Sequence, residues 1–327
     1  MIRSLAHCHF LPLLLGLSVQ LGLGSSTGWS ASAFLHSNDV VCLVGGANAV
    51  EAQEHGYFET LLRLKFSSLN LRFRSLAHEG DTVFAQPRDF NYPSLPKQLE
   101  DTQATVVLVC FGQIEALAGR EKVARFADAY ERLLEKLGTR RIVLMSPIRF
   151  EASARPLPDL SHRNQDLQLY VAAIRALAEK RGCLFVDLFG VTNRPPGRLE
   201  RLTSDGFHLT ASGHYHYDSL AARQLADSPQ DSEVTINPDT GGFSRRDWER
   251  VRQAVVAKNR FWTAYYRPMN WAFLGGDRTD QPSSRDHRDP KVRWFPEEMQ
   301  RFVPLIDQAE RQIASLTSTL QADKGRR

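Results

Sequence analysis

Asp205 and His208 are the clearest pair of residues in this sequence that could do chemistry. They stand in the segment Asp205-Gly206-Phe207-His208, between the last predicted strand and a helix. A spacing of three residues lets the carboxylate reach an imidazole nitrogen. Asp205 would then fix the tautomer of His208 and stabilise its protonated form. The pair is therefore interpreted as a base and its orienting group, and the alternative is that both residues only cap a loop.

A base of this kind needs a nucleophile, and the first predicted strand-to-helix turn is where one is expected. The apolar run Val40 to Val44 is followed by two glycines and then by apolar residues at helical spacing, up to Leu62. In an open parallel sheet such a turn is a favoured place for a reacting group. Here the turn holds Gly45-Gly46-Ala47, and alanine has no reactive atom.

Four segments together resemble the SGNH, or GDSL-type, hydrolases, a family of esterases and lipases, over about residues 40–225. The family blocks are Gly-Asp-Ser, a single glycine, Gly-x-Asn-Asp and Asp-x-x-His, each following a strand. The corresponding segments here are Gly45-Gly46-Ala47, Gly80, Gly112-Gln113-Ile114-Glu115 and Asp205-Gly206-Phe207-His208. The resemblance implies ester hydrolase ancestry, with esterified carbohydrates or small esters as substrates.

Two positions depart from this pattern. The resemblance places Ala47 where the serine nucleophile belongs, and it places Gly80 and Ile114 at the oxyanion hole, with Ile114 in place of the asparagine. Alanine cannot supply the attacking oxygen, and loss of one oxyanion donor alone costs about 100- to 1,000-fold in rate. We therefore expect weak or lost activity. The alternative is a non-catalytic module that uses the relic cleft to bind a glycan or an envelope partner.

Other residues are candidates for a replacement nucleophile or for a second site. Thr82 and Ser204 are the hydroxyls nearest in sequence to the two retained blocks, and His208 could also activate a water directly. His214 and Asp218 would share one face of a helix, while His216 would point elsewhere. This favours ring packing over a metal site, and no metal or other cofactor is expected.

The composition predicts an ordinary globular protein. The chain has 327 residues, with 42% hydrophobic and 24% charged residues. This length allows one sizeable core with an extension. The net charge of +4 is small and its basic residues are spread out, so the sequence does not predict a nucleic-acid partner.

The N-terminus has the pattern of a secretory signal peptide over residues 1–33. Arg3 is followed by an apolar stretch from Phe10 to Leu23 and by the ending Ala31-Ser32-Ala33. We expect cleavage after Ala33, export to the periplasm, cell envelope or extracellular space, and no membrane span thereafter. An uncleaved anchor is the alternative, although the apolar stretch is short for one. The remaining cysteines, Cys42, Cys110 and Cys183, all lie in predicted strands and are interpreted as buried free thiols.

The pattern of elements indicates what positions the candidate residues. Apolar strands alternate with amphipathic helices, which predicts a three-layer α/β/α sandwich with a mostly parallel sheet over residues 34–228. The predicted strands cover residues 40–44, 68–75, 104–111, 141–146 and 183–188, and the predicted helices begin near residues 50, 121, 164 and 212.

A polar linker over residues 229–243 and a helical C-terminal extension over residues 244–327 are predicted to follow. Ser244 and Asp247 look like a capping box that opens a helix, and the last helix is expected to begin near Pro296. The extension carries several large aromatic residues, which would pack it onto the main domain or else cover the cleft or stack on sugar rings. These residues are Trp262, Tyr265, Tyr266, Trp271 and Phe273.

Overall fold

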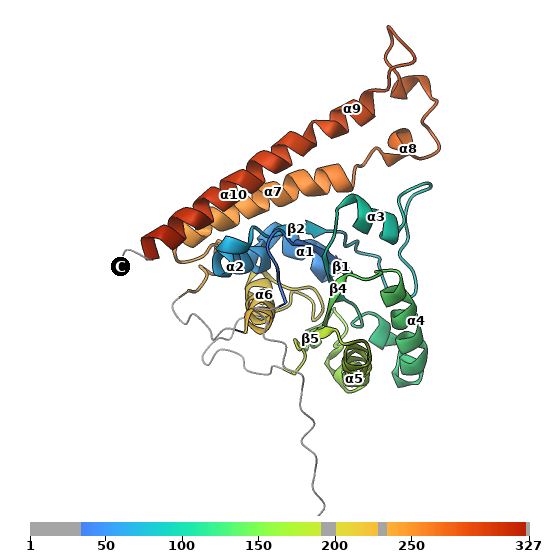
Figure 1. The fold of residues 1–327 in the computed structure, drawn as a ribbon. Helices are drawn as coiled ribbons and strands as arrows, with labels where there is room; N and C mark the ends of the chain where they lie inside the picture. Colours follow the sequence, from blue (N-terminus) through green and yellow to red (C-terminus); the bar gives the residue numbers. More distant parts are fainter. Residues whose placement is uncertain (1–33, 191–200, 228–233, 325–327) are drawn as a thin grey trace, which may run out of the picture.

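A single parallel sheet forms the centre of the protein (Figure 1). The structure is a computed structural model and describes residues 34–190, 201–227 and 234–324. Five strands lie in the order β2-β1-β3-β4-β5, and every neighbouring pair is parallel. The strands are β1 (Val40–Gly45), β2 (Arg72–Ser75), β3 (Val106–Cys110), β4 (Arg141–Met145) and β5 (Leu184–Val186). The predicted parallel sheet is confirmed.

The central strands are apolar throughout because helices cover both faces of the sheet. Val40, Cys42 and Val44 of β1 point into one core, whereas Val41 points into the other. Continuous apolar strands are typical of sheets buried in this way. The first core is covered by α3 (Leu95–Asp101), α4 (Val123–Glu135) and α5 (Asn164–Arg181), and the second by α2 (Tyr57–Lys65) and α6 (Ala211–Ala226). The three layers are therefore as predicted.

Several predicted boundaries differ from the structure. The second strand begins at Arg72 and not at Ser68, because a 3-10 turn and Asn70, with a φ of 51°, precede it. The first helix is split into α1 (Ala47–His55) and α2 by Gly56, whose φ of 67° ends one helix and starts the next. The free thiol Cys42 is buried, but Cys110 and Cys183 are only half-buried, so the expected burial was wrong for these two.

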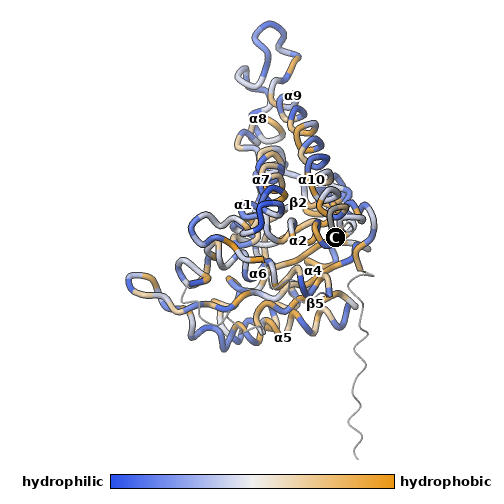
Figure 2. The backbone as a smooth tube through the Cα atoms, turned by 90° about the vertical axis from the view of Figure 1, so that its left-hand side faces the viewer, coloured by the Kyte–Doolittle hydropathy of each residue, from blue (hydrophilic) through white to orange (hydrophobic). Residues whose placement is uncertain are grey.

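The C-terminal extension forms a long helical hairpin. Figure 1 shows α7 (Arg246–Tyr266) and α10 (Phe302–Lys324) side by side, with α8 (Trp271–Leu274) and α9 (Trp294–Gln300) near the far end. The loop that joins α8 and α9 is hydrophilic (Figure 2). None of the helices within residues 34–190, 201–227 and 234–324 is long and apolar enough to cross a bilayer.

The segment before α7 does not behave as a plain linker over its described residues. Val234, Ile236 and Phe243 are buried against Tyr57 and Trp248. The predicted capping box is wrong: the N-cap of α7 is Arg245, because Ser244 instead pairs with Thr235 through its backbone and its hydroxyl. The domain boundaries at residues 228 and 243 stay predictions.

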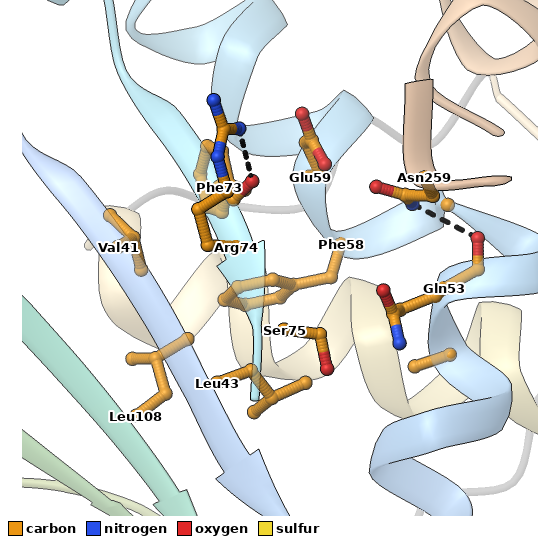
Figure 3. A pocket seen from close by; sticks show the side chains of 12 residues that line it. Val41, Leu43, Gln53, Phe58, Glu59, Phe73, Arg74, Ser75, Leu108 and Asn259 are labelled. Atoms are coloured by element: carbon orange, nitrogen blue, oxygen red, sulfur yellow. Dashed lines mark hydrogen bonds between the residues drawn. The ribbon is translucent and has the colours of Figure 1, made fainter. Parts of the chain in front are cut away.

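Buried charges hold the hairpin against the sheet. We call the following group the hairpin ion cluster: Glu59, Arg63, Arg74, Lys258 and Glu310. Lys258 Nζ lies 2.7 Å from a Glu59 oxygen, and Arg74 lies 2.5 Å from Glu310. A small cavity of about 50 Å³ lies beside Glu59 and Arg74, and Figure 3 shows the side chains that line it.

The hairpin also covers the outer edge of the sheet, which β2 forms. Lys258 Nζ donates to the carbonyl of Phe73, and the indole of Trp262 donates to the carbonyl of Ser75 at 2.8 Å. An unpaired strand edge is otherwise a template for aggregation. The extension is thus part of the same packed structure as the sheet.

Candidate active site

The Asp205–His208 pair forms as the spacing predicted. Asp205 Oδ2 lies 2.6 Å from His208 Nδ1, and Oδ1 accepts the backbone N–H groups of Phe207 and His208. Gly206 has a φ of 92°, and a Cβ there would lie 2.6 Å from the carbonyl oxygen of Glu151, so the tight turn requires glycine. The loop-capping alternative also holds, since one carboxylate oxygen caps the turn while the other binds the ring.

The hydrogen bonds also settle the charge state of Asp205. Burial would raise its pKa, but hydrogen bonds from the His208 ring and from two backbone amides outweigh this effect and lower it. Asp205 is therefore ionised at neutral pH. An ionised Asp205 keeps the proton of the imidazole on Nδ1 and leaves Nε2 as the nitrogen that can accept another proton.

His208 and Ala47 line the same cavity, which has a volume of about 410 Å³. The ends of β1 and β3 and the loops after β4 and β5 meet there, as expected at the carboxyl edge of a parallel sheet. Its lining residues are Gly46, Ala47, Asn48, Ala49, Glu79, Asp81, Cys110, Phe111, Gly112, Gln113, Ile114, Glu115, Leu117, Pro147, Ile148, Phe207 and His208. The structure thus brings three of the four family blocks to one cavity directly.

Ala47 is the first residue of α1, immediately after the end of β1. A Cβ on Gly45 would lie 2.9 Å from the carbonyl oxygen of Cys110, so the close packing of the end of β1 against β3 depends on that glycine. The N–H groups in the first turn of a helix have no partner within it and attract negative charge. The start of α1 therefore offers backbone donors beside Ala47, the position at which the resemblance to the family expects a serine.

Asn48 holds the loop that carries His208. Its Nδ2 donates to the carbonyl of Phe207 at 3.1 Å, and its Oδ1 accepts the N–H of Leu209 at 3.0 Å. Nδ2 also lies 3.3 Å from Gln113 Oε1 in the third block. The amide therefore binds the backbone on both sides of His208, a role that sequence reasoning missed because the partners lie about 160 positions away.

The third block supplies an apolar wall to the cavity. Ile114 lines the cavity and is 47% exposed. Glu115 is buried and accepts the N–H groups of Gly112 and Val83 at 2.8 and 2.9 Å. Burial raises the pKa of this carboxyl, although these hydrogen bonds oppose the rise. Glu115 thus ties the third block to the loop after the second.

The second block lies at the mouth of the cavity. Gly80 itself is exposed, while its neighbours Glu79 and Asp81 line the cavity. Asp81 forms an ion pair with Arg88, and Glu79 forms one with Arg267, just beyond α7, at 2.6 Å. The C-terminal extension therefore contacts the candidate site through an ion pair that the sequence did not indicate.

The hydroxyls considered as replacement nucleophiles lie elsewhere. Thr82 accepts the N–H groups of Phe84 and Ala85 within its own turn, and Ser204 donates to the carbonyl of His208. Neither lines the cavity, and none of the described residues that line it is serine or threonine. Cys110 does line it, but burial raises the pKa of this thiol to about 12, so it is not a thiolate at neutral pH.

The other candidate residues, in α6 and in the C-terminal extension, pack against neighbouring side chains. His214 of α6 stacks on His55 of α1 with ring centroids 4.5 Å apart. The residues that the structure describes contain no group of three or more His, Cys, Asp or Glu side chains that could hold a metal ion. In the extension, Trp262 stacks on Tyr266 and Trp271 donates to the carbonyl of Phe90. These aromatics pack the hairpin onto the main domain and do not line the cavity.

Solved structures with a similar fold include several ester hydrolases. A gut microbial diltiazem-metabolizing enzyme is 15% identical, with a TM-score of 0.48, and the match covers 64% of this chain but only 52% of that chain. A lipase/acylhydrolase from Enterococcus faecalis is 18% identical, with a TM-score of 0.44, over 59% of this chain and 100% of the other. An acetyl xylan esterase is 20% identical, with a TM-score of 0.42, and the match covers 55% of this chain and 96% of that chain. Such low similarity carries no argument about activity.

The sequence itself identifies the family. A comparison with curated proteins found no match. The model of the GDSL-like Lipase/Acylhydrolase family matches residues 28–216, which is more than half of the chain and includes all four blocks. This chain belongs to the GDSL-like lipase/acylhydrolase family.

Proposed function

We propose that this protein is an exported member of its family whose cleft binds a small ester but hydrolyses it weakly or not at all. One observation carries the proposal. His208 and Ala47 share a cavity whose described lining residues include neither serine nor threonine. The base and its orienting group are in place, and the atom that they would activate is missing.

The geometry leaves only a slow route to hydrolysis. With an ester carbonyl beside Ala47, His208 Nε2 would have to take a proton from a water molecule that no side chain holds as a nucleophile. The developing oxyanion would be met by backbone amides alone, because Ile114 offers no donor. Removal of a triad serine leaves only the weak catalysis that binding and the oxyanion hole provide.

Hydrolysis of p-nitrophenyl acetate tests this proposal. We expect the wild-type protein to be at or barely above background. Ala47→Ser combined with Ile114→Asn should raise the rate, because it restores an oxygen for His208 and a donor for the oxyanion. His208→Ala in that double variant should abolish the gain. Robust turnover by the wild type that disappears with His208→Ala would refute the loss of catalysis.

Export is the second part of the proposal and rests on the signal-like pattern of residues 1–33, which lie outside the described residues. Cleavage after Ala33 would leave Phe34 and Leu35, both buried in the second core, at the start of the mature chain. N-terminal sequencing of exported protein should begin near Phe34. Exported material that still contained Arg3 would contradict cleavage.

A further inference from the structure

Exposed apolar side chains lie in the third block, which lines the candidate active site, and in the neighbouring loop after β2. Phe84, Ile114 and Leu117 are 44%, 47% and 36% exposed, although large apolar residues usually lie inside a protein. The segments that carry them are joined, because the N–H of Val83 donates to Glu115. Grouped exposed apolar residues mark ligand or partner sites more often than single ones do.

Two of these residues continue into the cavity itself. Ile114 and Leu117 line it, together with Phe111, Pro147, Ile148 and Phe207. The volume of about 410 Å³ lies in the usual range of ligand pockets, roughly 300–1,000 Å³. The third block thus presents an apolar wall where the family pattern has the amide of an asparagine.

Apart from His208, whose Nε2 remains available, the polar side chains of the cavity are already hydrogen-bonded or ion-paired within the protein. Asn48 is hydrogen-bonded to Phe207 and Leu209, and Glu115 accepts two backbone N–H groups.

The other polar side chains are also held. Gln113 lies within hydrogen-bond distance of Asn48 and of the carbonyl of Ile148. The carboxylates of Asp81 and Glu79 are paired with arginines. A sugar brings several hydroxyls that each need a partner when they are buried, and few partners remain here. An alkyl chain or an aromatic ring needs none.

We propose that this cleft takes an uncharged ester whose larger part is an alkyl chain or an aromatic ring, and that Ile114 and Leu117 form the wall on which this part packs. The inference deepens the function proposed above, because it names the ligand class of the same cleft. It does not depend on whether the ester is cleaved, since the apolar wall acts on binding.

Two acetate esters separate an apolar ligand from a carbohydrate ligand. Hexyl acetate and methyl 2-O-acetyl-xyloside carry the same acyl group on different alcohols. Their binding to the full chain is measured by saturation-transfer NMR, which also shows whether each ester stays intact. We expect hexyl acetate to bind at least about tenfold more tightly, because its alkyl chain leaves water on binding.

Matched variants locate the binding wall. Leu117→Gln should weaken the binding of hexyl acetate by about tenfold, since it replaces an apolar contact by an amide. Leu169→Gln is the control, because Leu169 is 42% exposed on α5 and does not line the cavity. It should change binding little, and thermal unfolding of both variants should show that they are folded.

The outcomes separate the two proposals. Equal or tighter binding of the xyloside, no binding of hexyl acetate, or equal effects of the two leucine variants would overturn the apolar ligand class. Preferential binding of hexyl acetate together with rapid cleavage would support the ligand class and overturn only the proposed loss of catalysis.

Discussion

Two groups of charged residues in this protein differ sharply in their surroundings. The hairpin ion cluster is almost completely buried, and Lys258 at its centre is shielded from solvent. The Asp205–His208 pair is about one-third exposed and borders a cavity of about 410 Å³. Both groups rely on short charge-assisted contacts. The first borders a small cavity of about 50 Å³, whereas the second borders the cavity of the candidate active site.

This difference separates charged residues that stabilise the fold from charged residues that border the candidate active site. Buried ions are expensive to desolvate and persist only when partners and hydrogen bonds surround them, so the hairpin ion cluster fixes the extension on the sheet. A pair that is about one-third exposed adds little to stability, so its geometry is better explained by the cleft that it faces. The pair is therefore assembled beside a cavity that Ala47 also lines.

Breaking the buried group should have the largest effect on stability. Glu310→Gln removes the charge that faces Arg63 and Arg74, and two guanidinium groups would then be buried with too little negative charge. We expect the free energy of unfolding to fall by about 3–5 kcal/mol in urea denaturation. Asp307→Asn, at an exposed position of the same helix, is the control and should be nearly neutral. Equal effects of the two variants would contradict this view of the cluster.

Acid should weaken the same group. Burial would raise the pKa of Glu310, but Arg63, Lys258 and Arg74 outweigh it and lower the pKa to about 2. A carboxyl whose pKa is lowered by folding stabilises the fold at every pH above its pKa in the unfolded state, which is near 4.5. This contribution is lost as the pH falls toward 2. Wild-type stability should therefore drop faster than that of Glu310→Gln between about pH 5 and pH 2. If urea denaturation gave the same pH dependence of stability for the wild type and for Glu310→Gln, Glu310 would contribute nothing to the acid sensitivity of the fold.

Loss of the Asn48 amide should have an intermediate effect. Asn48→Ala leaves the carbonyl of Phe207 and the N–H of Leu209 without this partner, so we expect about 1–2 kcal/mol of destabilisation. In the Ala47→Ser/Ile114→Asn background it should also lower kcat more than it raises KM, because His208 would be poorly placed. Unchanged kcat would show that the amide does not position the base.

Removal of the exposed pair should have the smallest effect on stability. His208→Ala is expected to change the free energy of unfolding by about 0–1 kcal/mol, as for other exposed ion pairs. The measurement is urea denaturation at pH 7, where Asp205 is ionised. A loss as large as that expected for Glu310→Gln would place His208 among the structural charges and weaken its assignment as a relic base.

What the sequence could predict was local. Continuous apolar strands alternating with helices indicated the parallel sheet, because burial on both faces leaves a pattern along the chain. The Asp205–His208 contact follows from a spacing of three residues within one turn. The absence of a hydroxyl from Ala47 was also visible, since it is a matter of residue type.

What only the tertiary structure decided depends on residues far apart in the chain. Asn48 reaches across about 160 residues to hold both sides of His208, and Arg267 reaches back to Glu79 at the cavity mouth. The hairpin ion cluster likewise joins Glu59 and Lys258, which are 199 positions apart. No periodicity records such contacts, because they are set by how packed helices and loops meet in space. The fold therefore decided which residues line the cleft and anchor the extension, whereas the residue types at Ala47 and Ile114 could be read from the sequence alone.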